Sequence, residues 1–502
     1  MAPIDDSELS PDRLASVFAG FVRQVAGAAA GQASPLLTRM RDHLGIDLAR
    51  QPVIVEQFDT FEQPNLQVAL DAYAAADGRT VDVVGVSMEN KRFMAVGLSE
   101  LATWGTGAGT RPPLIEGPVD FVNFHLADGR PLACVQFGLF LVSDGKARLV
   151  VLVTGPSEMG DPRRQKLRLE VMSAGPEDAR SFIAEIRGLM TRLNVYRGHT
   201  IALSAGSLQI GPGPVTLVQF QPVPDVTRED VILPDDLLDR VERQTVGFSD
   251  HAPELLAGGH SLKRGMLLYG LPGTGKTLTV MYLIGRMPGR TVILTTGRGL
   301  GLVQTVAQMA RQLAPSMVVL EDVDLVAEER TMPGFGARPV LFELLNEMDG
   351  LHDDQDVIFV LTTNRPDILE PALAARPGRI DLAAELPLPD EGGRRRLFDL
   401  YSRRLTLDGV DLEGLVERTD GASPAYVKEL MRKAALRAAQ AGSGDTVRQQ
   451  HIDAAFQELA AGGRLAERLL GFRPEPPGPP DGPGPPPGTP TGFPWVGRIA
   501  RG

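Results

Sequence analysis

A glycine-rich loop with one lysine and one threonine carries the clearest chemistry in this 502-residue chain. Residues 270–277 read Gly-Leu-Pro-Gly-Thr-Gly-Lys-Thr, a complete G-x-x-x-x-G-K-[ST] pattern. Glycines let successive backbone N–H groups point at a phosphate, Lys276 supplies a charge to the β- and γ-phosphates, and Thr277 supplies a hydroxyl ligand for Mg²⁺. The pattern predicts a nucleoside triphosphate site. Its predicted contacts are Gly270, Pro272, Gly273, Thr274, Gly275, Lys276, Thr277 and Leu278.

The runs on either side of this loop predict the elements that position it. Residues 265–269 are apolar and predict a strand, and residues 278–287 predict a helix. A strand–loop–helix order sets a phosphate at a helix N-terminus, where the helix dipole favours negative charge. A chance glycine-rich turn is the alternative, but the complete pattern between a strand and a helix favours the phosphate loop.

A second apolar run ends in two adjacent carboxylates. Residues 317–320 predict a buried strand, and Glu321 and Asp322 follow it directly. Phosphoryl transfer needs one carboxylate that holds Mg²⁺ through water and a second that orients the attacking water. Because successive side chains of a strand point in different directions, adjacent acids can take both roles. We expect Thr277 and Glu321 at the metal and Asp322 at the water.

Polar residues further along the chain complete the predicted catalytic set. The run 357–364 predicts another buried strand, which closes in Asn364, a side chain suited to hydrogen-bond a γ-phosphate or the attacking water. A turn at 375–379 carries Arg376 and Arg379, and arginine stabilises charge on a transferring phosphoryl group. The alternatives are an ordinary strand-to-turn transition for Asn364 and solvated loop positions for the arginines.

Composition and charge bound the class of protein. The net charge of −12 disfavours a nucleic-acid binder that relies on a basic surface. The one cysteine, Cys134, excludes an intrachain disulfide and a cysteine-based metal cluster, and we expect it to be a buried strand residue. No run approaches about 20 apolar residues, and the acidic N-terminus lacks the features of a secretory signal. These features predict a cytoplasmic protein without a membrane segment.

The chain divides by composition into four parts. Helical patterns at 14–25 and 182–193 flank strand-like runs whose Asp-Gly turns predict hairpins. Beyond them, strands alternate with helices, which is typical of a parallel sheet, until about residue 390, after which only helices are expected. The predicted parts are an N-terminal α+β domain over 1–221, an α/β nucleotide-binding core over 222–389, a helical lid over 390–472 and an extended Pro/Gly-rich tail over 473–502.

These motifs, in this order, strongly resemble AAA-type ATPases, above all the valosin-containing-protein and membrane AAA-protease branches. The resemblance covers about residues 229–462, and it rests on residues 270–277, 318–324, 342–350, 361–367, 375–381 and 419–426. It implies ATP as the nucleotide and a homo-hexameric ring with ATP held between neighbouring subunits. It further implies that Asn364 is a polar sensor, that Arg376 and Arg379 reach the next subunit's site, and that Gly421 and Ala422 lie near the nucleotide from the lid side.

The chain departs from the family pattern in several places. The usual acid order is Asp then Glu, whereas this chain has Glu321 then Asp322, so that the water-orienting side chain is one methylene shorter. The turn before Arg376 is one residue longer than usual. Substrate-threading relatives carry an aromatic residue in the segment that matches 295–302, where this chain offers only Leu300 or Leu302 to grip a polypeptide. No His-Glu-x-x-His motif is present, so the zinc protease domain of the membrane relatives is not expected.

Three functions agree with these features to different degrees. The leading one is an ATP-hydrolysing machine that remodels proteins, with residues 1–221 binding a protein client or adaptor. A slow ATP-gated scaffold or assembly switch without processive threading is the alternative, and the acid order and the absent aromatic favour it. A nucleic-acid-linked ATPase is disfavoured by the net charge and by the lack of a nucleic-acid-binding motif.

Overall fold

The computed structural model describes residues 34–87, 96–104, 114–156, 166–206, 215–295, 302–324, 346–347, 350, 354–367 and 379–461. Within these residues the chain forms two compact units. One holds the N-terminal region and the α/β sheet, and the other holds the lid together with the loop Gly270–Lys276. The predicted helix at 14–25, Arg376, Leu300 and the tail at 473–502 lie outside the described residues.

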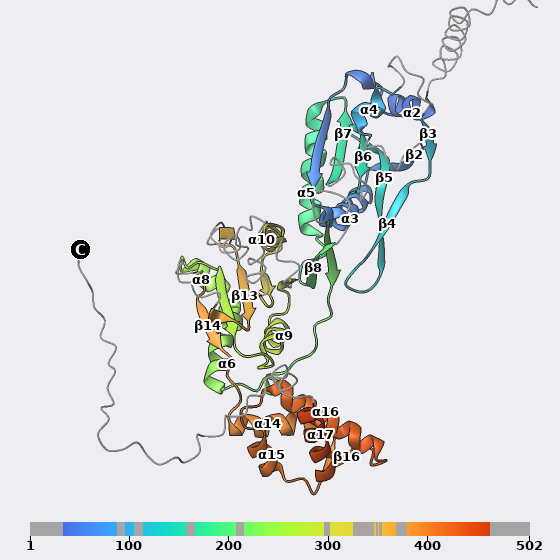
Figure 1. The fold of residues 1–502 in the computed structure, drawn as a ribbon. Helices are drawn as coiled ribbons and strands as arrows, with labels where there is room; N and C mark the ends of the chain where they lie inside the picture. Colours follow the sequence, from blue (N-terminus) through green and yellow to red (C-terminus); the bar gives the residue numbers. More distant parts are fainter. Residues whose placement is uncertain are drawn as a thin grey trace, which may run out of the picture. The chain divides into compact units, whose positions relative to one another are not determined.

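The N-terminal region is built on an antiparallel sheet with the strand order β1-β7-β6-β5-β2-β3 and with β4 paired to β5 (Figure 1). Both faces are covered, because alternate residues of β6 pack into different cores: Val151 lies with helices α3 and α5, and Val150 with α2 and α4. The elements are α2 (Pro35–Leu44), β1 (Val53–Phe58), α3 (Gln63–Ala74), β2 (Thr80–Ser87), α4 (Leu98–Ala102), β3 (Ile115–Gly117), β4 (Asp120–His125), β5 (Pro131–Ser143), β6 (Arg148–Thr154), β7 (Leu167–Ser173) and α5 (Pro176–Arg192).

The predicted hairpins of this region are confirmed. Strand β4 pairs with β5 across the turn at Gly129, and β5 pairs with β6 across the turn at Gly145. Cys134 is fully buried in β5, as predicted, and burial raises the pKa of its thiol to about 12. The predicted helical pattern at 182–193 is wrong at its last position: α5 ends at Arg192, and Leu193 is 41% exposed.

The second sheet is the predicted parallel one. Its order is β14-β10-β13-β12-β11-β8-β9, and all neighbours from β14 to β8 run parallel (Figure 1). Every residue of β12 and β13 is buried, which explains why both read as unbroken apolar runs. The elements are β8 (Thr200–Gly206), β9 (Val215–Phe220), α6 (Asp235–Glu242), α7 (Phe248–Asp250), α8 (Ala252–Ala257), β10 (Arg264–Tyr269), α9 (Lys276–Arg286), β11 (Thr291–Thr295), α10 (Val303–Gln312), β12 (Ser316–Leu320), β13 (Val357–Thr363) and β14 (Leu382–Glu385).

Strands β8 and β9 extend this sheet with residues that precede position 221. Strand β8 pairs in parallel with β11, from Thr200 opposite Val292 to Leu203 opposite Thr295, and β9 returns antiparallel beside β8. The approach to β8 is also fixed, because the Val292 N–H donates to the carbonyl oxygen of His199 at 3.0 Å. The N-terminal region therefore supplies two strands to the sheet that carries the phosphate loop.

Arg290 joins the amino ends of three strands of this sheet. Its guanidinium donates to both carboxylate oxygens of Asp356 at 2.8 Å and to the carbonyl oxygen of Ser316 at 2.9 Å. The residue is only 5% exposed, so its charge is paired where water is largely excluded. This ion pair lies at the amino ends of the strands, at the edge opposite to their carboxyl ends. It holds β11, β12 and β13 together there.

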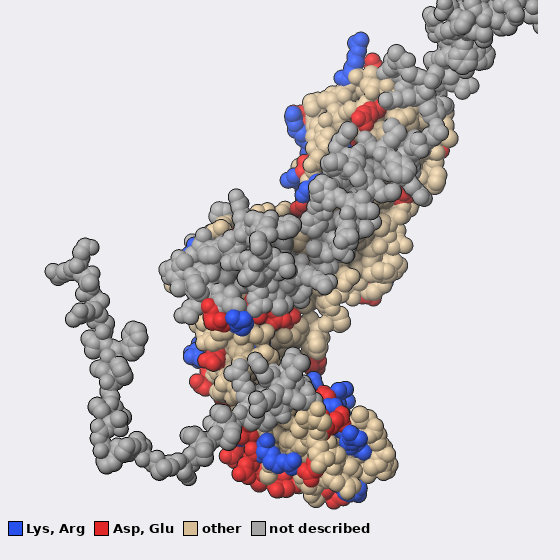
Figure 2. All heavy atoms as spheres, in the orientation of Figure 1, with Lys and Arg blue, Asp and Glu red and all other residues tan. Residues whose placement is uncertain are grey.

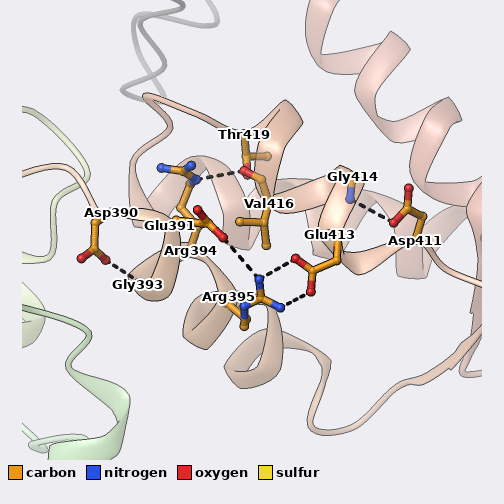
Figure 3. Close-up of polar contacts among 10 residues, drawn as sticks. All are labelled: Asp390, Glu391, Gly393, Arg394, Arg395, Asp411, Glu413, Gly414, Val416 and Thr419. Atoms are coloured by element: carbon orange, nitrogen blue, oxygen red, sulfur yellow. Dashed lines mark hydrogen bonds and ion pairs between the residues drawn. The ribbon is translucent and has the colours of Figure 1, made fainter.

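The lid consists of four helices around one apolar core, with a short parallel strand pair, β15–β16. The expectation of helices alone beyond residue 390 is therefore wrong in this detail. Three helices have an N-cap residue whose side chain accepts a hydrogen bond from a backbone N–H of the first turn. These residues are Asp390, Asp411 and Ser423, of which Figure 3 shows the first two. The elements are α14 (Glu391–Ser402), β15 (Thr406–Asp408), α15 (Leu412–Arg418), α16 (Pro424–Gln440), β16 (Thr446–Arg448) and α17 (Gln449–Ala461).

Two neighbouring arginines of α14 differ in what surrounds them (Figure 3). Arg394 is 6% exposed, and its guanidinium donates to the carbonyl oxygens of Val416 at 3.0 Å and Pro389 at 3.2 Å. Arg394 also forms an ion pair with the exposed Asp420 carboxylate at 2.8 Å, whereas Arg395 pairs with the exposed carboxylates of Glu391 and Glu413. The first arginine therefore links helices inside the lid, whereas the second forms ion pairs in solvent.

We expect Arg394→Leu to loosen the lid and Arg395→Ala to leave it nearly unchanged. The leucine variant leaves the buried Val416 carbonyl and the half-buried Pro389 carbonyl without their charged donor, at a cost of about 2 kcal/mol, whereas exposed ion pairs contribute little. Hydrogen exchange of the α15 amides measures this, and about 30-fold faster exchange is expected for Arg394→Leu alone. Equal exchange in both variants would contradict the assignment.

No helix among the described residues is long and apolar enough to cross a membrane. On the face shown in Figure 2, the described basic side chains are interspersed with acidic ones over the lid.

Candidate active site

The glycine-rich loop leaves β10 at Gly270 and reaches α9 at Lys276. Gly270 has a φ of 153°, and a Cβ there would lie 2.4 Å from the carbonyl oxygen of Leu386, so no other residue fits. Lys276 is 7% exposed, and its ammonium donates to the carbonyl oxygens of Gly270 and Leu271 at 3.0 Å each. The lysine charge is thus held inside the turn of the loop.

The other predicted contacts of the loop differ in exposure. Thr274 is buried, and its hydroxyl donates to the Leu271 carbonyl oxygen at 2.9 Å. Pro272 is exposed, as are Thr277 and Leu278 in the first turn of α9. A Cβ added at Gly275 would meet no atom within 4 Å, so the space beside this part of the loop is open to a ligand.

The loop contacts the start of lid helix α16 directly. Gly273 has a φ of 80°, and a Cβ there would lie 2.8 Å from the Ser423 hydroxyl and from the Ala425 Cβ. The Ala425 N–H donates to the Gly273 carbonyl oxygen at 3.2 Å. Gly421 and Ala422 form the turn just before Ser423, with Ala422 fully buried. Gly421 and Ala422, the two lid residues predicted near the nucleotide, therefore directly precede the residues that contact the loop, Ser423 and Ala425.

The two acids and Asn364 come together at the carboxyl edge of the sheet. Strands β12 and β13 pair in parallel with Leu320 opposite Leu361, so the residues that follow each strand meet at the same edge. The Asn364 side-chain amide donates to Asp322 Oδ1 at 3.2 Å. Glu321 remains in line with the sheet, because its N–H donates to the Thr295 carbonyl oxygen at 3.0 Å.

Asp322 has an unusual backbone. Its φ is 51°, and it is the single non-glycine residue with a positive φ among the described residues. This left-handed conformation costs about 1 kcal/mol or more for most side chains, although aspartate tolerates it better than most. Two bonds to one residue of β13 hold it: Asp322 N–H donates to the Thr362 hydroxyl at 3.1 Å, and Val323 N–H donates to the Thr362 carbonyl oxygen at 3.0 Å.

A third acid, Asp324, supports the end of β13 and was missed from the sequence. It is 6% exposed, and its Oδ1 accepts hydrogen bonds from the Thr363 hydroxyl at 2.8 Å and from the Asn364 N–H at 3.3 Å. Asp324 therefore fixes the backbone from which the Asn364 side chain reaches Asp322. Two features of the sequence could have indicated this role. Asp324 follows Asp322 by two residues, and the strand that ends in Thr362 and Thr363 offers hydroxyl groups as partners.

The acid pair fits a hydrated Mg²⁺ ion. Glu321 Oε1 is buried and has no hydrogen-bond partner among the described residues, a state that is costly for a carboxylate. Mg²⁺ prefers carboxylate and hydroxyl oxygens and keeps several of its waters, which can donate to such an oxygen. Glu321 and Thr277, the predicted metal ligands, carry oxygens of the kind that Mg²⁺ prefers.

Arg379 lies at the other end of the sheet. It precedes β14, and two residues later the Asp381 carboxylate accepts a hydrogen bond from the Gly265 N–H at 2.9 Å, near the start of β10. Gly265 is opposite Phe359, five residues before Asn364. That interval is about 16 Å along a strand, longer than an arginine side chain. Arg379 therefore does not serve the acid cluster of its own chain.

Two more predictions concern residues that border segments outside the described residues. Leu302 is 5% exposed and packs in the core beside α10, so the expectation that it grips a polypeptide is wrong. Most of the motif at 342–350 lies outside the described residues.

A parallel strand that runs into a glycine-rich loop and a helix, with acids after a neighbouring strand, defines a P-loop nucleotide-binding core. Comparison with known proteins finds two family models that match this part of the chain. Residues 266–388 match the ATPase family associated with various cellular activities (AAA), and residues 409–454 match the AAA+ lid domain. The chain therefore contains an AAA-type ATPase domain followed by its lid.

Similar proteins share this part of the chain. A proteasome-activating nucleotidase of Methanopyrus kandleri is 32% identical over 53% of this chain and 64% of its own length. A 26S proteasome regulatory subunit 6B homolog of Aspergillus niger is 34% identical over 42% of this chain and 53% of its own. The ATP-dependent zinc metalloprotease FtsH 3 of Symbiobacterium thermophilum is 33% identical over 49% and 41%. The chain thus spans less than two thirds of each of these relatives.

Proposed function

We propose that this protein is an ATP-hydrolysing AAA-type ATPase that remodels other proteins as a ring of identical subunits. The observation that carries the proposal is the convergence of Glu321, Asp322 and Asn364 at the carboxyl edge of a sheet whose strand β10 enters a phosphate loop. The similar proteins include a proteasome-activating nucleotidase and an ATP-dependent protease, and these names support a polypeptide as the substrate.

Each part of the site has a proposed role. Lys276 and the loop N–H groups bind the β- and γ-phosphates, and Gly421 and Ala422 approach the nucleotide from the lid. Thr277 and Glu321 hold Mg²⁺, which neutralises phosphate charge when bound. Asp322 orients the attacking water, and Asn364 holds the Asp322 carboxylate in place.

In the proposed homo-hexameric ring, each site receives an arginine from the neighbouring subunit. Arg379 lies at the edge of the sheet opposite to the acids, from which it can enter a neighbour's site. Arg376 is proposed to act beside it. The N-terminal α+β domain then binds a client or adaptor protein, and the net charge of −12 disfavours a nucleic-acid partner. A reducing cytoplasm suits a chain whose one cysteine is a buried thiol.

The slow ATP-gated scaffold stays the second candidate, because one observation favours it. Leu302, one of two residues suited to grip a polypeptide, is buried in the core. Such a scaffold binds ATP and assembles but turns over slowly.

The ATPase rate per subunit, measured over a hundredfold range of protein concentration, tests the proposal. Lys276→Ala serves as the blank. A shared site predicts a rate per subunit that rises steeply as subunits assemble. A rate equal to the blank at every concentration, with ATP still bound, would contradict the enzyme and favour the scaffold.

A further inference from the structure

The backbone of Asp322 determines where its carboxylate lies relative to that of Glu321. In a continuing strand, the residue after Glu321 would point to the opposite face. Here β12 ends at Leu320, Asp322 has a φ of 51°, and its carboxylate lies 3.2 Å from the Asn364 amide. The position of this carboxylate therefore depends on a backbone conformation that most residues avoid.

Thr362 is the residue that holds this conformation. Its hydroxyl accepts the Asp322 N–H at 3.1 Å and its carbonyl oxygen accepts the Val323 N–H at 3.0 Å. Thr362 is 2% exposed in the centre of the sheet, so water does not readily replace the hydroxyl. The carbonyl bond is available to any residue at this position, whereas the hydroxyl bond requires threonine or serine.

We infer that Thr362 is a positioning residue for ATP hydrolysis, whose hydroxyl fixes the backbone of Asp322 so that this shorter acid keeps its carboxylate at the place where water is oriented. The inference rests on the proposed function. Thr362 acts through Asp322 and has no role in holding the nucleotide. Loss of the hydroxyl should therefore slow turnover without weakening substrate binding.

The test compares Thr362→Val, which has nearly the same shape, with Thr362→Ser, which keeps the hydroxyl, in the full-length protein. A misplaced catalytic group costs on the order of 10-fold to 100-fold in rate. We expect kcat of Thr362→Val to fall by about 10-fold or more with KM for ATP changed by less than about twofold, and Thr362→Ser to retain about half of the wild-type kcat. Thr362→Ala provides the same loss of the hydroxyl with less bulk, should valine prevent folding.

Three outcomes decide the inference. A fall in kcat for the valine and alanine variants with recovery in the serine variant supports it. A wild-type kcat in Thr362→Val, or an equal fall in Thr362→Val and Thr362→Ser, overturns it, although the wild-type rate would still support ATP hydrolysis. A wild-type rate no higher than that of Lys276→Ala overturns the proposed function and this inference together.

Discussion

Replacing Lys276 by alanine is expected to weaken ATP binding by about 100-fold. The lysine is buried, and its ammonium is held inside the turn of the loop. Removing the charged partner of a phosphate in such a place costs about 3 kcal/mol, which corresponds to about two orders of magnitude in Kd. Titration of the protein with ATP and Mg²⁺ by calorimetry measures the effect.

A matched substitution separates this effect from a general loss of positive charge. Lys146 lies in the exposed turn between β5 and β6, and Lys146→Ala should bind ATP as the wild type does. Thermal unfolding of both variants shows whether the Lys276 substitution disturbs the fold. Retained affinity in a folded Lys276→Ala protein would show that the loop is not the nucleotide site.

Arg379→Ala is expected to reduce kcat by about 10³-fold and to leave ATP binding intact, because an arginine finger acts on the transition state of phosphoryl transfer. If that arginine enters the neighbour's site, mixing with Asp322→Asn subunits should restore activity. In such a ring, the Arg379→Ala subunit keeps its own acids and receives an arginine from the Asp322→Asn subunit. The ATPase rate of mixtures at a fixed total concentration measures the rescue.

A double variant is the control for this experiment. Subunits that carry both Asp322→Asn and Arg379→Ala assemble from the same chain but supply no arginine, so they should give no rescue. Recovery with the double variant, or no recovery with Asp322→Asn alone, would be inconsistent with sites completed by a neighbour.

The α/β core and its loop were predictable because their signals are local. Strands buried on both faces appear as apolar runs, and the phosphate loop is a contiguous pattern between one such strand and a helix. The pairing of β8 with β11 was not predictable from sequence alone. It depends on backbone groups about 90 residues apart in sequence, and backbone groups are the same in every residue.

The site residues also fall into those with a local sequence signal and those without one. Glu321, Asp322 and Asn364 were found because each follows an apolar run. The roles of Thr362 and Asp324 were not predicted from the sequence. Both roles depend on the register of β12 against β13, which brings these residues opposite Asp322 and Thr363. The left-handed backbone at Asp322 is held by hydrogen bonds to Thr362, and the residue type only permits it, because aspartate tolerates this conformation better than most residues.

The pairing of β8 with β11 also determines how force can travel through this protein. The chain passes from the N-terminal sheet through α5 into β8, and β8 runs parallel to the strand beside the acid-bearing β12. A pull applied to a client held by the N-terminal domain would load β8 along its length. The hydrogen bonds of the ladder would then share the load and would have to break together, not one after another. If the N-terminal domain binds a client, as we propose, this ladder would let work done at the nucleotide reach the client without first stretching a linker.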